Sequence, residues 1–375
     1  MNDFSPRRLL VRGVNWLGDA VMTTPALQRL REAHSQAHIA LLTQAKLADL
    51  WTHHPAIDQV LAMEADEGPF AVGKRLLALE FDTALVLPNS PRSALEPFLA
   101  RIPRRIGYAR PWRNFLLTQR VAPRPGEIKM HKRSVGEIRA LTSGASSVGS
   151  AQPKPPPAAH HLHQYLHLVA ALGAQPEPLP PFIAVTAAEL EQTREKFGAT
   201  PTTAGRGPIL GLNVGAEYGP AKRWPRERFI AAAVELQRAL SCHCWVFGGP
   251  GDVALATGVA DALTKTGPVQ CLAGRTSLRE LCTALKLCDV LLTNDTGPMH
   301  LAAAVGTPVV VPFGSTCPEL TGPGLPGDGR HRFLGSAAPC SPCFLRQCPI
   351  DFRCMTGISV ETVVQAVREV LEARR

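Results

Sequence analysis

The sequence predicts an α/β protein made of two doubly wound, Rossmann-like domains. Three observations lead to this prediction. Short apolar runs alternate with helical patterns between residues 209 and 313, and such alternation is typical of βαβ units and a parallel sheet. A sparser version of the same rhythm occurs before residue 90. The chain has 375 residues, of which 45% are hydrophobic, so it is long enough for two domains with their own cores.

The individual elements follow from apolar spacing. Strands are expected where short apolar runs occur, at residues 9–11, 39–42, 84–87, 209–214, 244–247, 269–272, 290–293 and 308–313. Helices are expected where apolar side chains recur every three or four positions, at residues 25–33, 162–172, 226–240, 253–263, 278–287, 299–305 and 359–374.

Two Pro-rich stretches divide the chain. Residues 143–157, SGASSVGSAQPKPPP, have no apolar periodicity and are expected to form a flexible insertion. Residues 176–181 are the better candidate for the connection between domains. The sequence therefore predicts an N-terminal domain over residues 1–175, a C-terminal domain over residues 182–355 and a final helical segment over residues 356–375.

The formal net charge of +9 favours an anionic partner. Residues 92–133 contain eleven Lys and Arg against two Asp and Glu, which accounts for the whole surplus. A basic nucleic-acid-binding protein is the less favoured interpretation, because aromatic residues are only 6% of the chain and no recognition motif accompanies the basic window. A merely solvated basic surface is a further alternative. The N-terminus lacks the apolar core of a signal peptide, so we expect a cytoplasmic protein whose membrane contact, if any, is peripheral.

The first expected strand continues into RGVNWLGDAV. Asp19 lies beyond the end of that strand, where a carboxylate can face a ligand. The alternative is that Asp19 only caps the following helix.

A second motif, NVGAEYGPAKRWP, leaves the strand at residues 209–214 through a Gly-rich loop. Lys222 and Arg223 would then stand over the carboxyl end of the strand, where they could neutralise a diphosphate. Alternatively, the two cations are simply solvated.

A third motif, TNDTGPMH, passes from a strand into a helix. Thr296 and Gly297 fall at the helix N-terminus, where free N–H groups attract phosphate, and Asp295 could hydrogen-bond a sugar hydroxyl. The alternative is a plain N-cap at Asp295 or Thr296, with His300 packed in the core.

Four of the ten cysteines form the pattern C-x2-C-x4-C-x5-C, at Cys340, Cys343, Cys348 and Cys354. This spacing is compatible with a structural zinc or iron–sulfur site, and reduced structural thiols are the other interpretation. An NAD-dependent oxidoreductase is not favoured, because the G-x-G-x-x-G match at residues 322–327 contains two prolines and no helical pattern follows it.

Taken together, VNWLGDAVMTTPAL, GAEYGPAKRWP and TNDTGPMHLAAA resemble glycosyltransferase family 9, and CSPCFLRQCPIDFRCM resembles a Cys-bearing tail of some of its members. The resemblance implies a GT-B fold, in which two Rossmann-like domains face each other across a cleft. The N-terminal domain would bind the acceptor and the C-terminal domain the nucleotide sugar. The final helix would pack back toward the N-terminal domain.

The resemblance also implies a reaction, the inverting transfer of L-glycero-D-manno-heptose from ADP-heptose to the first heptose of the lipopolysaccharide inner core (heptosyl-Kdo2-lipid A). Such enzymes work at the cytoplasmic face of the inner membrane, so peripheral contact with its anionic leaflet is expected. No D-x-D motif occurs, and no obligatory metal cofactor is expected. Heptosyltransferase I or another family 9 glycosyltransferase is the alternative.

Matched position by position, the resemblance implies that Asp19 is the general base and that Lys222 supports the leaving ADP. Contacts to the nucleotide sugar are implied or expected at Glu217, Lys222, Arg223, Asp295, Thr296, Gly297 and His300. The basic window lies in the implied acceptor domain, and acceptor contacts are expected at Arg104, Arg105, Arg110 and Arg113.

Overall fold

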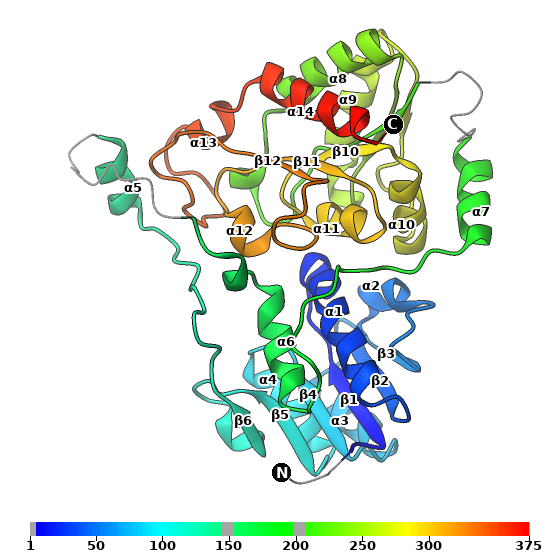
Figure 1. Ribbon diagram of the computed structural model, residues 1–375, viewed down its shortest axis with the longest axis vertical. Helices are drawn as coiled ribbons and strands as arrows, with labels where there is room; N and C mark the ends of the chain where they lie inside the picture. Colours follow the sequence, from blue (N-terminus) through cyan, green and yellow to red (C-terminus); the bar gives the residue numbers. More distant parts are fainter. Residues whose placement is uncertain (1–4, 144–153, 199–206, 375) are drawn as a thin grey trace. The chain divides into compact units, whose positions relative to one another are not determined.

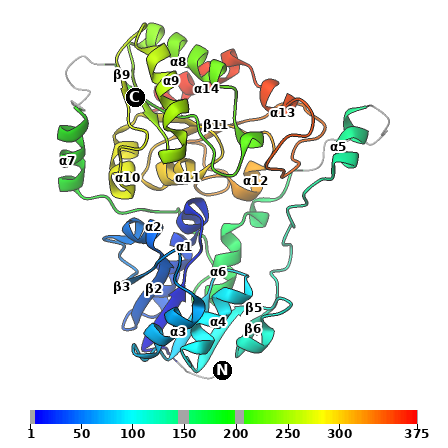
Figure 2. The same ribbon diagram turned by 180° about the vertical axis from the view of Figure 1, so that it is seen from behind.

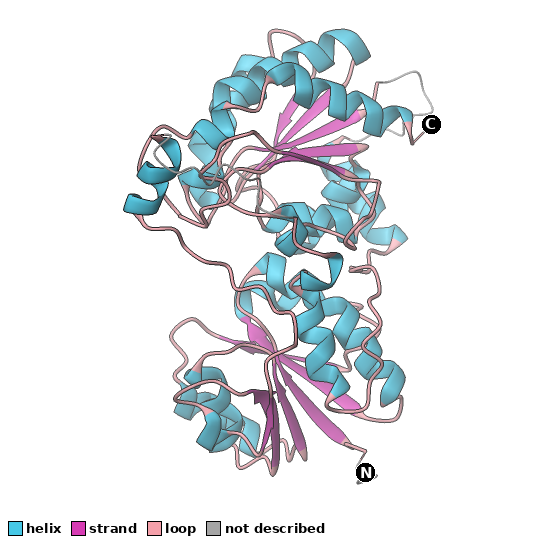
Figure 3. Ribbon diagram, turned by 60° about the vertical axis from the view of Figure 1, so that its left-hand side comes forward, coloured by secondary structure: helices cyan, strands magenta, loops and turns pink. Residues whose placement is uncertain are grey.

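The computed structural model describes residues 5–143, 154–198 and 207–374 (Figure 1). The chain divides into unit 1, Met1–Glu127 with Ala158–Ala184, and unit 2, Ile128–Pro157 with Val185–Arg375. Each unit has a six-stranded sheet whose strands are all parallel, with helices on both faces (Figure 3). The prediction of two doubly wound, Rossmann-like domains is confirmed. Most of the predicted flexible insertion, residues 144–153, lies outside the described residues.

Unit 1 has the strand order β3-β2-β1-β4-β5-β6. Its strands are β1 (Arg8–Arg12), β2 (His38–Gln44), β3 (Gln59–Met63), β4 (Thr83–Val86), β5 (Arg104–Tyr108) and β6 (Gln119–Val121). Its helices are α1 (Leu17–Ala33), α2 (Ala45–Ala48), α3 (Pro69–Leu77), α4 (Pro91–Leu99) and α6 (Leu162–Ala170), with the 3₁₀ turns η1 (Asp49–Trp51), η2 (Asn114–Leu116) and η3 (Pro157–Ala159) around them.

The central strands of unit 1 are mostly apolar because helices cover both faces of the sheet. Leu9, Leu10 and Val11 of β1 have no exposed surface. The outer strands are only partly buried. β6, QRV, has no apolar run, whereas β3, QVLAM, has one that was not assigned to a strand. Strand β5 begins with two arginines, Arg104 and Arg105, and was not predicted either.

Unit 2 has the strand order β12-β11-β10-β7-β8-β9. Its strands are β7 (Ile209–Asn213), β8 (His243–Phe247), β9 (Val269–Cys271), β10 (Val290–Thr293), β11 (Val309–Pro312) and β12 (Arg332–Leu334). Its helices are α5 (Val135–Thr142), α7 (Ala187–Phe197), α8 (Arg226–Leu240), α9 (Val253–Leu263), α10 (Leu278–Leu287), α11 (Gly297–Ala304), α12 (Pro318–Thr321), α13 (Arg353–Thr356) and α14 (Val360–Glu372), with short 3₁₀ turns η5 (Pro220–Lys222) and η6 (Pro250–Asp252). Helices α8, α9 and α10 begin and end where the apolar spacing predicted.

One segment belongs to unit 2 against expectation. Residues 128–157, assigned from the sequence to the N-terminal domain, join unit 2 because Ile138 of α5 packs with Cys340 and Cys343. The backbone N–H of Arg133 also donates to the Cys343 carbonyl at 3.1 Å. Both contacts depend on chain segments about 200 residues apart, which local patterns do not report.

The final helix, α14, contacts α8 and strands β10, β11 and β12 of its own unit (Figures 1 and 2). Its expected packing toward the N-terminal domain stays a prediction. Its apolar face, which includes Val363 and Val367, is fully buried in the core cluster of unit 2. Burial of that face provides the driving force for this position. No helix among the described residues is long and apolar enough to cross a membrane.

Candidate functional site

In unit 2 the order of strands reverses between β10 and β7, which are parallel neighbours. Ligands of doubly wound sheets bind beside the carboxyl ends of the strands at such a reversal. The loops that follow these two strands carry the second and third sequence motifs. Asn294 joins the loops: its amide N–H donates to the Val214 carbonyl at 2.9 Å, and its Oδ1 accepts the Trp224 N–H at 2.8 Å.

Lys222 and Asp295 form an ion pair at this point. The Lys222 Nζ lies 2.6 Å from Asp295 Oδ2, and the two side chains are 15% and 5% exposed. Thr316 donates its hydroxyl to the same carboxylate oxygen at 2.5 Å. The structure therefore holds one ammonium and one carboxylate, both largely shielded from water, beside the ends of β7 and β10. An anionic ligand can interact with this ammonium and a ligand hydroxyl with the carboxylate.

Helix α11 begins at the same place. Thr296 occupies its N-cap position in an extended conformation, and among the described residues no side chain caps the helix there. The alternative in which Asp295 or Thr296 serves as a plain N-cap is therefore not supported. Thr296 and Gly297 are partly exposed, so the positive end of the helix dipole is accessible to an anion. His300 is buried, with 6% exposure, as the core-histidine alternative expects.

Glu217 and Arg223 lie farther out on the same loop. Glu217 is exposed. The Arg223 side chain is 41% exposed and its Nη2 lies 3.8 Å from Asp252 Oδ1. The two adjacent cations, Lys222 and Arg223, thus have different surroundings, and Lys222 is the one held at the strand ends.

Tyr218 and Arg346 were not found from the sequence. The Lys222 ammonium lies 4.9 Å from the centre of the Tyr218 ring, and the Arg346 guanidinium lies 5.1 Å from it. Arg346 Nε also donates to the Tyr218 carbonyl at 2.9 Å, and the Tyr218 hydroxyl donates to the Phe344 carbonyl at 3.0 Å. The cysteine-containing segment therefore supports the loop that carries Lys222. The two residues are 128 positions apart, so no local signal could have joined them.

The four cysteines of that segment lie near one another, but no group of three or more His, Cys, Asp or Glu among the described residues is placed to hold a metal ion. The zinc or iron–sulfur site suggested by the spacing of Cys340, Cys343, Cys348 and Cys354 stays a prediction. Burial, with smaller contributions from the other three thiols, raises the pKa of Cys354 to about 12. Two of the cysteines, Cys340 and Cys343, pack against Ile138.

In unit 1, Asp19 is the third residue of α1, whose N-cap position is Trp16. Asp19 is therefore not the capping residue. Its carboxylate Oδ1 lies 4.0 Å from the His161 Nε2, and the side chains of Asp19 and His161 are 32% and 21% exposed. The carboxylate is partly accessible to solvent and lies beyond β1, as the first motif predicted.

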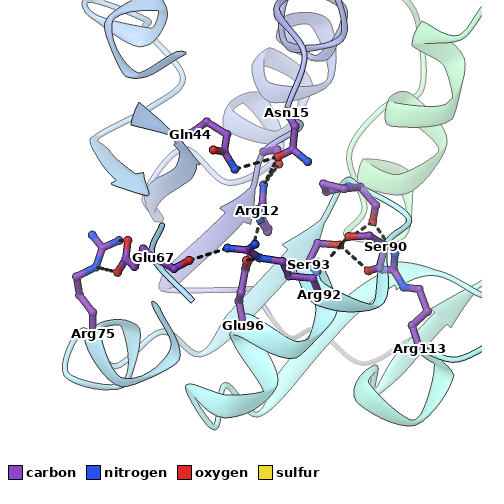
Figure 4. A network of polar contacts seen from close by, with 12 residues as sticks. Arg12, Asn15, Gln44, Glu67, Arg75, Ser90, Arg92, Ser93, Glu96 and Arg113 are labelled. Atoms are coloured by element: carbon purple, nitrogen blue, oxygen red, sulfur yellow. Dashed lines mark hydrogen bonds and ion pairs between the residues drawn. The ribbon is translucent and has the colours of Figure 1, made fainter. Parts of the chain in front are cut away.

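A buried arginine holds the loop between β1 and α1 (Figure 4). Arg12 Nε lies 2.7 Å from Glu96 Oε2, and the two side chains are 2% and 0% exposed. The Arg12 Nη1 donates to the Gly13 carbonyl at 2.5 Å and to Asn15 Oδ1 at 3.1 Å. This network connects α4 to the turn that leads into α1 and so fixes where Asp19 stands.

The four arginines expected at the acceptor do not form one surface. Arg104 and Arg105 lie at the start of β5, at the opposite edge of the sheet from the strand ends, about 13 Å away by strand rise. There Arg104 donates to Gln119 Oε1 at 2.9 Å and Arg105 to the Leu116 carbonyl at 2.7 Å.

Arg110 and Arg113 follow the carboxyl end of β5. Arg113 is 0% exposed, donates to the Pro88 carbonyl at 2.5 Å, and has its pKa lowered to about 10, chiefly by burial. It cannot touch a ligand directly in this arrangement. Arg110, whose side chain is 27% exposed and lies 3.3 Å from Glu127 Oε1, can do so.

Two Rossmann-like units, one with a cation and an uncapped helix N-terminus at its strand reversal, form the architecture of a GT-B glycosyltransferase. The model of "Glycosyltransferase family 9 (heptosyltransferase)" matches residues 70–352, and the chain belongs to this family. It is 30% identical to lipooligosaccharide heptosyltransferase 2 of Haemophilus influenzae, over 84% of this chain and 85% of that protein. It is likewise 30% identical to lipopolysaccharide heptosyltransferase 2 of Escherichia coli, with the same shares covered.

Solved structures agree with this assignment. ADP-heptose lipopolysaccharide heptosyltransferase II of E. coli superposes with a TM-score of 0.76 at 25% identity, covering 98% of this chain and 99% of that one. A family 9 glycosyltransferase from Veillonella parvula has the same fold, with a TM-score of 0.77 at 23% identity and coverage of 98% and 97%.

Proposed function

We propose that the protein transfers L-glycero-D-manno-heptose from ADP-heptose to the first heptose of the lipopolysaccharide inner core, on heptosyl-Kdo2-lipid A. The observation that carries the proposal is the Lys222–Asp295 pair, 2.6 Å apart beside the uncapped N-terminus of α11. This geometry suits a sugar diphosphate, and the relatives that cover most of the chain are named heptosyltransferase 2.

In the proposed reaction, unit 2 binds ADP-heptose. Lys222 and the N–H groups at Thr296 and Gly297 neutralise the diphosphate, and Asp295 accepts a hydrogen bond from a sugar hydroxyl. Asp19 takes the proton of the acceptor hydroxyl as its oxygen attacks the anomeric carbon. The bond from that carbon to the diphosphate breaks, its electron pair leaves with ADP, and the single displacement inverts the centre. Negative charge builds on the leaving group, so Lys222 stabilises the transition state more than the ground state.

The substrate assignment is tested by incubating the protein with ADP-heptose and either heptosyl-Kdo2-lipid A or Kdo2-lipid A, followed by mass spectrometry. We expect a mass gain of one heptose residue on the first acceptor alone. A gain on the unheptosylated acceptor alone would instead indicate heptosyltransferase I, and no gain on either acceptor would refute heptose transfer to this core.

The residue assignments are tested with two variants. Asp19→Asn should abolish transfer while leaving ADP-heptose affinity nearly unchanged, because the carboxylate acts on the acceptor. Lys222→Ala should weaken ADP-heptose binding and slow turnover by a further ~10²–10³-fold, the usual effect of removing one charge-stabilising donor. Normal turnover by Asp19→Asn would refute its assignment as the base.

We further propose that transfer requires no bound metal, since Lys222 and the α11 N-terminus supply positive charge where other glycosyltransferases use a D-x-D-bound cation, and the sequence contains no D-x-D. Turnover should survive dialysis against EDTA. A loss restored specifically by Mg²⁺ or Mn²⁺ would contradict this.

Of the four arginines expected at the acceptor, Arg110 is the one that is partly exposed near the strand ends, where it could meet a phosphorylated glycolipid. Arg110→Ala should raise the acceptor KM and leave ADP-heptose affinity unchanged. Arg75→Ala removes a partly exposed arginine from α3 and serves as the matched control. An unchanged acceptor KM in Arg110→Ala would indicate that the basic window, residues 92–133, is a general surface feature without a role in acceptor binding.

The protein is proposed to act in the cytoplasm, in peripheral contact with the anionic leaflet of the inner membrane. The side chains of Trp112 and Phe115, on either side of the start of η2, are 84% and 70% exposed. Arg120 Nε bonds the Asn114 carbonyl of the same turn at 3.0 Å. Exposed aromatic rings beside cations suit the interface of an anionic bilayer.

Vesicle sedimentation tests this contact. The protein should bind phosphatidylglycerol-containing vesicles better than pure phosphatidylcholine vesicles, and Trp112→Ser with Phe115→Ser should reduce binding. Phe70→Ser is the control, because Phe70 is 71% exposed but lies on α3. An equal loss of vesicle binding in Phe70→Ser would contradict a specific membrane-binding role for Trp112 and Phe115.

A further inference from the structure

A second titratable group lies beside Asp19. Helices α1 and α6 pack together within unit 1, and His161, the residue directly before α6, places its Nε2 4.0 Å from Asp19 Oδ1. One turn later, the Tyr165 hydroxyl lies 3.2 Å from the same nitrogen. The Tyr165 ring meets the imidazole edge-on, with ring centres 5.3 Å apart. The imidazole is thus held between a carboxylate and a phenol.

We propose that His161 positions Asp19 and is the final acceptor of the proton that the acceptor hydroxyl loses. The proton passes first to Asp19 and then to His161. The inference rests on the proposed role of Asp19 as the general base. It explains how a carboxylate, which is a weak base by itself, can remain ionised after each turnover.

The surroundings of His161 keep its ring neutral before the reaction. Burial lowers the pKa of His161, whereas the charges of Asp19 and Glu127 raise it and that of Arg124 lowers it. Burial also raises the pKa of Tyr165 well above its usual value, so its hydroxyl stays protonated. By rotating, that hydroxyl can donate to the neutral ring or accept a hydrogen bond from the protonated ring.

The proton transfer balances without another reactant. The acceptor O–H proton passes to a carboxylate oxygen of Asp19 as the new C–O bond forms and the electron pair of the broken bond leaves with ADP. The same proton then moves from Asp19 to His161 Nε2, which leaves a carboxylate beside an imidazolium. The negative charge that this step leaves on Asp19 raises the pKa of His161 and so favours the transfer. The 4.0 Å separation must shorten for the transfer, as catalytic hydrogen bonds often do when substrate binds.

His161→Gln tests the proposal in the full-length protein, with His53→Gln as the control because His53 is an exposed histidine of unit 1. We expect kcat of His161→Gln to fall by roughly 10–100-fold, in the lower range of acid–base effects, with both KM values unchanged within about twofold. The acid limb of kcat/KM should move to lower pH, because in the wild-type protein it reports the first protonation of the Asp19–His161 pair and the variant lacks the imidazole. Tyr165→Phe should give a smaller fall and move the limb in the same direction.

The shift of the acid limb separates proton acceptance from a purely structural role. A lower kcat with an unmoved limb, or an unchanged kcat, would overturn the proposal. If Asp19→Asn is inactive but His161→Gln keeps the wild-type rate and profile, the relay is refuted and the base assignment stands. If Asp19→Asn is fully active, the base assignment and the relay both fail.

A measurement that does not depend on turnover tests the proposal even if His161→Gln does not fold or the wild-type protein transfers no heptose. The imidazole of His161 is titrated by NMR in the wild-type protein and in Asp19→Asn. Loss of the carboxylate should lower the pKa of His161, because Asp19 raises it. An identical titration in both proteins would show that the two groups do not interact and would overturn the proposal.

Discussion

Glu96→Gln is expected to destabilise unit 1 strongly. The substitution keeps the shape of the side chain and one hydrogen-bond acceptor, but it removes the charge that compensates the buried guanidinium of Arg12. The two side chains are 0% and 2% exposed, so water cannot take the place of the carboxylate.

The magnitude follows from the geometry. Arg12 Nε lies 2.7 Å from Glu96 Oε2, which places the charge centres about 4 Å apart, and at an effective dielectric constant of about 20 their attraction is about 4 kcal/mol. Removal of one partner of a buried pair usually destabilises by about 3–5 kcal/mol. For a unit of this size each kcal/mol lowers the midpoint of thermal unfolding by about 2–4 °C, so we expect a decrease of roughly 6–20 °C.

Calorimetry of the wild-type protein, Glu96→Gln and Arg92→Ala measures the effect. Arg92 contacts the other oxygen of the same carboxylate at 3.5 Å, but its side chain is 49% exposed, so its loss should change stability by at most about 1 kcal/mol. A Glu96→Gln protein within about 1 kcal/mol of wild type, or equal effects of the two variants, would refute the reasoning.

Three further outcomes are expected. Arg346→Ala should raise the KM for ADP-heptose severalfold, as measured by initial rates, because Arg346 supports the Tyr218 ring against which Lys222 lies; an unchanged KM would show that this support is dispensable. Gly219→Ala should have a similar or larger effect, since Gly219 has a positive φ of 151° and an added Cβ would overlap the Arg346 carbonyl; wild-type kinetics would contradict that overlap. Burial lowers the pKa of His54 from its usual 6.5 to about 4, so below 6.5 the unfolded chain binds a proton that the folded chain excludes. The free energy of unfolding, measured with urea, should therefore fall between pH 6.5 and pH 4, by up to about 3 kcal/mol from this group, and fall less in His54→Gln; equal pH dependence in the two proteins would refute the contribution.

The two loops proposed to bind the nucleotide sugar were the part of the molecule most accessible to sequence reasoning. Lys222 and Asp295 lie in short motifs that directly follow buried strands, and both strands end at the same edge of one sheet. Once the strands are recognised, the position of the motifs follows from the topology of parallel sheets. What the motifs could not show is that the two side chains pair at 2.6 Å, because that distance depends on the hydrogen bonds of Asn294 across both loops.

The positions of the four arginines expected at the acceptor were less accessible to sequence reasoning. A charge count over residues 92–133 treats all arginines alike, whereas the sheet separates them by strand direction and burial. Arg104 lies at the start of β5, Arg113 is fully buried, and Arg110 alone of the four remains partly exposed near the strand ends. Charge composition does not show at which end of a strand an arginine lies or how deeply its side chain is buried.

Local sequence patterns were thus sufficient to predict the fold class, the bounds of helices such as α8 and α10, and the order of the family motifs. The reason is that apolar periodicity and turn chemistry act over a few residues. Only the folded chain decided that α14 covers its own unit, that Arg346 supports Tyr218 and that His161 stands beside Asp19. These contacts join residues roughly 130 or more positions apart along the chain or depend on which faces are buried. Their physical basis is the burial of apolar surface and the pairing of buried charge, which are properties of the packed structure rather than of any local segment.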